Sequence, residues 1–269
     1  MYLLDLYKGP TFQRIFIVAH NRKRDLIMNK ITTLGSILAI TYTTSTIAHG
    51  SYYKPGFLAG AHVGISNGSG SFTSNFDPVF IEAASATGKA RKTSALFGIL
   101  GGYRHIFSEG ITVGFDISGN VYTNNELNKL VIHSYNNPLT FTNNLSRRYS
   151  VIPSVNFGKV FCGRWHLTLG LGIAFSGFRQ KITAPFPTAS NPTRAASTVR
   201  KLGFVPSIAV EYAATQNVSV TGNISYEIYK KISKTFNGQS IGFPIAGSSY
   251  TSSISPRYLT LKVGAVYRF

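Results

Sequence analysis

The stretch Tyr258-Leu-Thr-Leu-Lys-Val-Gly-Ala-Val-Tyr-Arg-Phe269 is the part of this 269-residue chain that decides its predicted fold. Apolar side chains occupy every second position from Leu259 to Phe269, and the positions between them are mostly small, polar or charged. A two-residue period places the two sets on opposite faces of a β-strand. The pattern of the rest of the chain then decides what surrounds the apolar face.

Seven further segments repeat this alternation, with glycine, serine, threonine and charged residues on the less apolar face. The eight predicted strands are residues 57–72, 93–107, 111–122, 148–161, 165–178, 201–213, 218–228 and 258–269. Each apolar stretch is long enough for the roughly 9–11 residues with which a tilted strand crosses a bilayer. We therefore predict an all-β fold, an eight-stranded antiparallel up-and-down transmembrane β-barrel with its apolar faces toward lipid.

The predicted connections alternate between short and long. The tight turns are residues 108–110, 162–164 and 214–217, and the long loops are residues 73–92, 125–147, 179–200 and 230–256. Short periplasmic turns and long extracellular loops are typical of outer-membrane barrels. Pro153 and Pro206 fall within strands at outward positions, where we expect bulges because proline donates no ladder hydrogen bond.

Composition excludes several other classes of protein. The single cysteine, Cys162, permits no intramolecular disulfide, and no run of 18 or more apolar residues follows the N-terminal region to form a transmembrane helix. The net charge of +18 would suit binding to nucleic acid. However, the basic residues are scattered over loops and strand ends, without a nucleic-acid-binding motif. We predict no nucleic-acid partner, and a basic surface that faces the phosphate-rich lipid of an outer leaflet.

The N-terminal residues are predicted to be an export signal. Basic residues up to Lys30 precede a mostly apolar or small stretch from Ile31 to Ala48, and Ala48-His49-Gly50 offers a small-x-small cleavage site. We therefore divide the chain into residues 1–50, an N-terminal extension with the signal peptide, and residues 51–269, the barrel. Met28 is the expected true start, because an ordinary signal sequence follows it.

Charged residues on the inward faces are expected to pair inside the barrel, because an isolated buried charge is costly. The predicted lumen charge network consists of Arg104, Asp116, Glu211, Lys262 and Arg268. An eight-stranded barrel is only wide enough for its own side chains, so we expect a plugged lumen. The alternative, in which these charges line a gated ion path, stays open.

Aromatic residues gather at the periplasmic ends of the predicted strands. Such rings prefer the boundary between lipid and water. The predicted aromatic belt consists of Phe57, Tyr103, Phe107, Phe161, Trp165, Tyr212, Tyr267 and Phe269.

We find no set of residues that predicts catalysis, a cofactor or a metal. A nucleophile needs a base within hydrogen-bond reach and a third group that orients the base, and no same-face pair of this kind occurs at an outer strand end. His133 and Ser134 are neighbours in a predicted loop, but such a pair is far more often an ordinary polar loop. We therefore predict that the chain is not an enzyme.

Aromatic and basic residues of the long loops are candidates for binding host surface molecules or anionic sugars. They are Phe76, Phe80, Lys89, Arg91, Tyr135, Phe141, Arg147, Arg148, Phe186, Arg194, Lys230, Lys231, Lys234, Phe236, Phe243 and Tyr250.

With its signal segment, eight alternating strands and terminal Tyr267-Arg268-Phe269, the chain resembles the small outer-membrane barrels of Gram-negative bacteria, the OmpA-like and opacity-type porin group. The resemblance covers residues 51–269. It implies export to the Gram-negative outer membrane, with outer-membrane lipid and lipopolysaccharide as partners. It also implies that the barrel assembly machinery recognises an ending that consists of Val263, Ala265, Tyr267 and Phe269.

Three functional hypotheses follow. The first is a non-enzymatic barrel that serves as envelope structure and as a surface antigen or adhesin through its external loops. The alternative is a small passive porin-like channel. A distant third is an outer-membrane lipid hydrolase.

Overall fold

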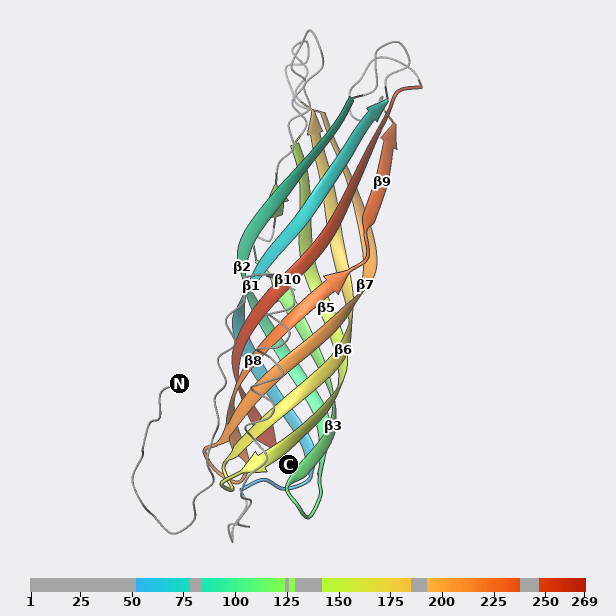
Figure 1. Ribbon diagram of the computed structural model, residues 1–269. Coiled ribbons are helices and arrows are strands. Elements are labelled where there is room, and N and C mark those ends of the chain that lie inside the picture. The colour runs from blue at the N-terminus through green and yellow to red at the C-terminus, as the bar shows by residue number, and fades with distance from the viewer. Residues whose placement is uncertain (1–51, 78–83, 124–125, 129–141, 185–192, 238–246) are drawn as a thin grey trace, which may run out of the picture. The chain divides into compact units, whose positions relative to one another are not determined.

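The computed structural model describes residues 52–77, 84–123, 126–128, 142–184, 193–237 and 247–269 (Figure 1). All regular elements in these ranges are β-strands. The described residues contain no helix that is long and apolar enough to cross a membrane. The predicted signal peptide, its cleavage site and the expected start at Met28 lie outside the described residues.

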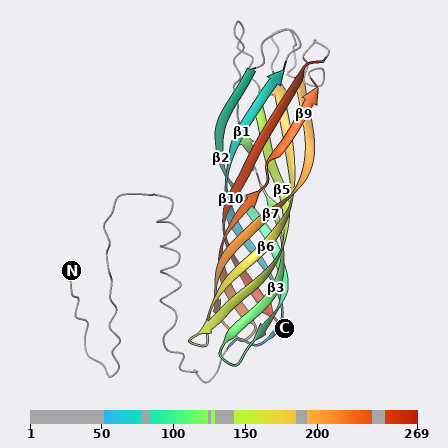
Figure 2. The same cartoon turned by 45° about the vertical axis from the view of Figure 1, so that its right-hand side comes forward.

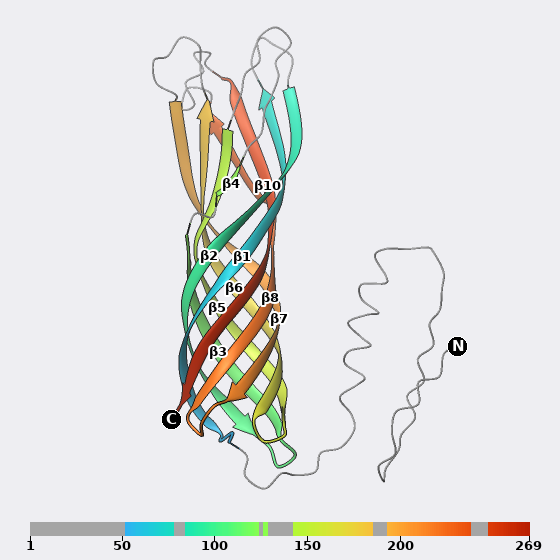
Figure 3. The same cartoon turned by 90° about the vertical axis from the view of Figure 1, so that its left-hand side faces the viewer.

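Eight long strands close into an antiparallel barrel, which confirms the predicted fold class. They are β1 (Gly56–Asp77), β2 (Ala84–Ile106), β3 (Ile111–Tyr122), β5 (Thr142–Phe161), β6 (Trp165–Ala184), β7 (Thr193–Ala213), β8 (Val218–Tyr229) and β10 (Ser249–Arg268). Each pairs with the next in this order, and β10 pairs with β1 to close the ring. Two short strands extend the wall: β4 (Glu126–Asn128) pairs with β5, and β9 (Ile232–Asn237) pairs with β10. The tilted strands wrap around a common interior (Figure 3).

The two ends of the barrel differ from each other. At the end that holds the C-terminus, tight turns join β2 to β3, β5 to β6 and β7 to β8, as predicted. At the other end, the predicted extent of the long loops was wrong, because much of each loop is strand. For example, β1 continues to Asp77 and β2 begins at Ala84, both within the predicted loop of residues 73–92. Most of the strands therefore run well beyond the segments that the sequence predicted, whereas β3 and β8 keep nearly the predicted bounds. The long strands can be followed in Figure 2.

Side-chain polarity reverses part-way along the strands. On the outer face of β1, alternate residues from Phe57 to Ile65 are apolar, whereas those from Asn67 to Asp77 are polar. On its inner face, small and polar residues give way to Phe72 and Phe76, which are both buried. β6 shows the same reversal, with apolar outer residues up to Phe175 and basic residues beyond.

This reversal divides the barrel into a membrane-spanning half and a half that stands above the membrane. Exposed large apolar side chains surround the half with the tight turns, and only lipid makes such a surface favourable. The other half has a polar exterior and an ordinary apolar core. The buried apolar core consists of Phe72, Phe76, Ala90, Leu127, Leu145, Ile152, Ala174, Phe178, Ile182, Val205, Tyr229, Ile232, Phe236, Tyr250, Ile254 and Tyr258. Ile152, Ala174 and Val205 are the part of this core that lies at the level of the lipid-facing residues.

The two strand prolines leave the register intact. Pro153 has no partner in β6, and Pro206 has none in β8, yet the pairing resumes beyond each with no shift. The bulges predicted at these positions were therefore wrong. The register of β5 and β6 shifts instead between Arg147 and Tyr149, so Arg148 is the extra residue of a bulge.

Candidate functional site

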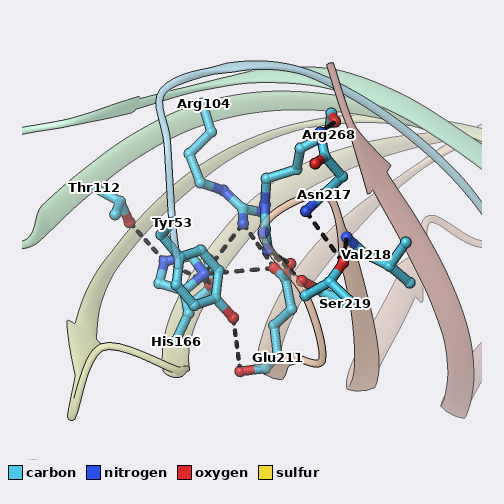
Figure 4. Close-up of polar contacts among 11 residues, drawn as sticks. Tyr53, Arg104, Thr112, His166, Glu211, Asn217, Val218, Ser219 and Arg268 are labelled. Atoms are coloured by element: carbon cyan, nitrogen blue, oxygen red, sulfur yellow. Dashed lines mark hydrogen bonds and ion pairs between the residues drawn. The ribbon is translucent and has the colours of Figure 1, made fainter. Parts of the chain in front are cut away.

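Glu211 of β7 is the centre of a charge cluster at the periplasmic end of the lumen (Figure 4). Its Oε2 accepts a hydrogen bond from Arg104 Nη1 at 2.7 Å, and its Oε1 pairs with Arg268 Nη2. Arg268 Nη2 also donates to Ser219 Oγ at 2.5 Å. All three charged residues are buried, so the guanidinium groups compensate the carboxylate where water is excluded. Three of the five predicted lumen charges thus lie together, and we call them the base cluster.

His166 of β6 extends the base cluster across the barrel. Arg104 Nη1 lies 3.2 Å from His166 Nδ1, and because a guanidinium group only donates, Nδ1 must accept. The ring proton then lies on Nε2, which donates to Thr112 Oγ1 at 2.7 Å. The histidine is therefore a neutral link between two walls of the barrel.

Tyr53, which precedes β1, closes the barrel from the periplasmic side. Its hydroxyl donates to the Glu211 carbonyl oxygen at 3.0 Å, and the Arg268 guanidinium carbon lies 4.1 Å from its ring centroid. Burial, reinforced by the Glu211 carboxylate, raises the pKa of Tyr53 to about 12, so the phenol remains a donor. The adjacent Tyr52 is held in turn by Arg164, which donates to its hydroxyl at 2.6 Å. No role was predicted for this segment, because its residues show no alternation of apolar and polar side chains.

Asp116 and Lys262, the other two predicted charges, line a cavity of about 100 Å³ next to the base cluster. Neither forms an ion pair with any described residue, and β1 and β2 lie between their strands in the ring. The five charges therefore do not form one network of ion pairs. Asn156 Nδ2 donates to Asp116 Oδ2 at 2.8 Å, and His62 Nε2 lies 2.7 Å from Asn120 Oδ1. A polar cavity of this size has room for water.

Inward-facing glycines make room for the larger side chains of this cavity. A Cβ atom on Gly98 would collide with the His62 ring, and one on Gly102 would collide with the Asp116 carboxylate. The glycines that mark the inner faces in the sequence therefore set where the polar side chains lie.

A second ion pair closes the lumen on the outer side of the cavity. Arg147 Nη1 donates to Glu227 Oε2 at 2.5 Å, and both residues are at most 1% exposed. The Arg147 guanidinium carbon lies 3.6 Å from the ring centroid of Tyr122 and 3.7 Å from that of Tyr258. Tyr229 adds a hydrogen bond of 2.5 Å to Glu227. We call these five residues the aromatic clamp.

The aromatic clamp was not predicted from the sequence because of the bulge. Glu227 was predicted on an inner face, but Arg147 was predicted in an external loop. Alternation counted back from the outward Tyr149 would also turn Arg147 outward, and only the extra residue, Arg148, turns it inward. Arg147 directly precedes the predicted strand of residues 148–161, and this position was the one feature of the sequence that could have indicated an inward charge.

The other residues predicted to lie in binding loops differ in where the structure places them. Phe76, Phe236 and Tyr250 are buried in the apolar core, whereas Lys89, Arg91, Arg148, Lys230, Lys231 and Lys234 are exposed. Phe80, Tyr135, Phe141, Phe186 and Phe243 lie outside the described residues, as does the side chain of Arg194.

The residues of the predicted aromatic belt lie on the outer face near the tight turns. Neighbouring strands bring them into pairs: Phe57 and Tyr103 have ring centroids 5.2 Å apart, and Trp165 and Tyr212 have centroids 4.8 Å apart. Tyr267 and Phe269 form a third contact at 5.1 Å. The predicted assembly signal shares this outer face, with Val263, Ala265, Tyr267 and Phe269 all exposed.

The described histidines have structural partners. His62 and His166 lie inside the lumen with the amide and hydroxyl partners given above, away from lipid. His105 packs against the Phe107 ring, with centroids 4.8 Å apart. His133 and Ser134 lie outside the described residues. Within the described ranges, no three residues of His, Cys, Asp or Glu gather as a metal site would require.

No family model matches the sequence, and no curated protein matches it significantly. Solved outer-membrane barrels do resemble the structure. The outer membrane protein OprG from Pseudomonas aeruginosa is 11% identical with a TM-score of 0.49, and the match covers 81% of this chain and 97% of OprG. The outer membrane protease OmpT from Escherichia coli is 10% identical with a TM-score of 0.45, covering 85% and 99%. Neisserial surface protein A is 14% identical with a TM-score of 0.35, covering 76% and 97%. The proteins that this chain resembles in structure are thus outer-membrane β-barrel proteins.

Proposed function

We propose that this chain is a non-enzymatic barrel of the Gram-negative outer membrane that serves as envelope structure and as a surface antigen or adhesin. The observation that carries the proposal is the reversal of side-chain polarity along the strands. It supports a barrel whose outer half stands above the membrane as a rigid, packed support for the connections at its tip. Rigid scaffolds that hold variable loops are a common basis for surface recognition.

Thiol labelling of intact cells tests this orientation. Cys162 lies exposed in the turn between β5 and β6, on the periplasmic side of the proposed barrel. In the variant C162S/T73C, the only thiol lies on the polar outer face of β1. A maleimide on a long poly(ethylene glycol) chain, too bulky to cross the outer membrane, is expected to label C162S/T73C but not the wild type. Both proteins should react after the cells are lysed. Labelling of Cys162 on intact cells would reverse the orientation and contradict the proposal.

The alternative of a passive channel is disfavoured by the two layers that cross the lumen. The base cluster holds one buried carboxylate between two buried guanidinium groups, and the aromatic clamp holds a buried ion pair among three tyrosines. Much of the apolar core lies beyond the clamp. We therefore expect the purified protein to give no steady openings in a planar lipid bilayer. Reproducible unitary conductance would instead support the porin-like function. A chromatographic fraction from cells without the gene controls for contaminating porins.

The proposed partners follow from the surface. Outer-membrane lipid would surround the apolar band, and lipopolysaccharide would face the exposed basic residues above it. The assembly machinery would recognise the outward row that ends at Phe269. Binding to host surface molecules would involve the tip of the barrel. A lipid hydrolase remains the distant alternative, and the internal positions of His62 and His166 oppose it.

A further inference from the structure

A hollow of about 270 Å³ enters the barrel wall between β4, β5 and β6. Near it, the described residues of β3 pair with β5 as far as Val121 and Tyr149, and β4 pairs with β5 from Glu126 and Ser146. The lining includes Glu126, Asn144, Arg147, Arg148, Arg179 and Lys181. We call this hollow the wall site.

The wall site lies directly above the apolar band. Tyr149 and Phe175 are exposed on the outer faces of β5 and β6. Arg148 and Arg179 lie on the same two strands, farther toward the outside of the cell. This is the level at which lipid tails give way to headgroups. Lipid of the outer leaflet would therefore present its headgroup to the wall site.

Three basic residues of the wall site have no ion-pair partner among the described residues. They are Arg148, Arg179 and Lys181. Arg148 and Arg179 are exposed on neighbouring strands, and like charges so placed repel one another. A bound anion would offset this cost, and arginine pairs match the geometry of phosphate in particular.

Two buried polar atoms in the wall site also lack partners. Among the described residues, Arg147 Nε and Asn144 Oδ1 have no hydrogen bond and no access to solvent, and an unsatisfied buried polar group is unfavourable. The first is a donor and the second an acceptor. The exposed Glu126 carboxylate gives the hollow an acceptor for hydroxyl or amide hydrogens, which phosphate alone does not supply.

We infer that the wall site binds the phosphorylated sugar headgroup of an outer-leaflet glycolipid. The basic side chains would hold the phosphate, while Glu126 would accept hydrogen bonds from the sugar. The inference rests on the proposed function, because it requires the barrel to be in an outer membrane. It adds to that proposal a defined site and the chemistry of its ligand.

The test is native mass spectrometry of the full-length mature barrel in detergent, titrated with diphosphorylated lipid A. R148A/R179A is expected to bind about tenfold more weakly than the wild type, since each arginine donates charge-assisted hydrogen bonds. The matched control is K92A/R257A, which removes two exposed basic residues of β2 and β10 that lie above the same band and outside the wall site. It should bind as the wild type does. Equal weakening in both variants would mean diffuse charge attraction and would overturn the inference.

Two further ligands identify the chemistry. Lipid A without phosphates should bind the wild type and R148A/R179A equally weakly, and millimolar inorganic phosphate should not displace lipid A. Full displacement by phosphate would point to a free anion as the ligand and overturn the glycolipid assignment. If R148A/R179A does not fold, R148K/R179K keeps the charge but loses the paired donors, and unchanged binding by it overturns the inference. A chain that is soluble without detergent would refute the membrane assignment itself.

Discussion

Replacing Glu227 with alanine is expected to lower the free energy of unfolding of the barrel by about 3–5 kcal/mol. The variant leaves the Arg147 guanidinium without its carboxylate at a position that is 1% exposed. The neighbouring rings of Tyr122 and Tyr258 stay in place but do not neutralise the charge. The loss is therefore dominated by the cost of an uncompensated buried cation, and not by the value of one hydrogen bond.

The measurement is urea-induced unfolding in detergent micelles, followed by the fluorescence of Trp165, the single tryptophan. The control is R147M/E227L, which removes both charges and keeps much of the apolar volume. Its stability should stay within about 1–2 kcal/mol of the wild type, because a buried pair is often replaceable by apolar residues. If both variants were destabilised equally, the clamp would owe its stability to shape, and the charge argument would fail.

The membrane-spanning half of the fold could be predicted from sequence because one environment acts on all its outer faces. From Trp165 to Phe175, every second residue is apolar and faces lipid. The inward residues of the same stretch are small or polar. Alternation of this kind identifies both the strand and its orientation. The predicted strand ends at the tight turns agree with the structure for the same reason.

The outer half was missed because its polarity pattern is the opposite one. In β1, Phe72 and Phe76 point inward among polar outward residues, and such a segment resembles a polar loop with scattered aromatics. A strand in water with one buried face also alternates, so the error was to expect a single orientation throughout. The reversal can be recognised in a sequence, because the apolar positions of one strand change from odd to even residue numbers, or from even to odd.

The lumen shows where local patterns stop being sufficient. Arg104, Glu211 and Arg268 come together because each lies near a strand end on the tight-turn side of the barrel, and the sequence locates these strand ends well. Arg147 depends on a bulge that no residue type announces, and Tyr53 depends on a segment outside the strands. Both positions are set by long-range packing. Knowledge of the closed ring was needed to find them.

Replacing Leu171 with arginine is expected to destabilise the barrel by about 2–4 kcal/mol in a lipid bilayer. Leu171 is 55% exposed on the outer face of β6, between the belt residue Trp165 and the last apolar residue Phe175. An arginine here would place its charge in the hydrocarbon, too far from either interface for the side chain to reach water fully. Unfolding in guanidinium chloride from phospholipid vesicles, again followed by Trp165 fluorescence, measures the effect.

Thr73→Arg is the matched control, because Thr73 is exposed on the outer face of β1 above the apolar band. Its partners in the neighbouring strands, Ser253 and Thr87, are uncharged, so the change should shift stability by no more than about 0.5 kcal/mol. The difference between the two variants measures the lipid environment directly, since the introduced side chain is the same. If L171R cost no more than T73R, the exposed leucine would face water, and the polarity reversal would no longer mark the edge of a membrane.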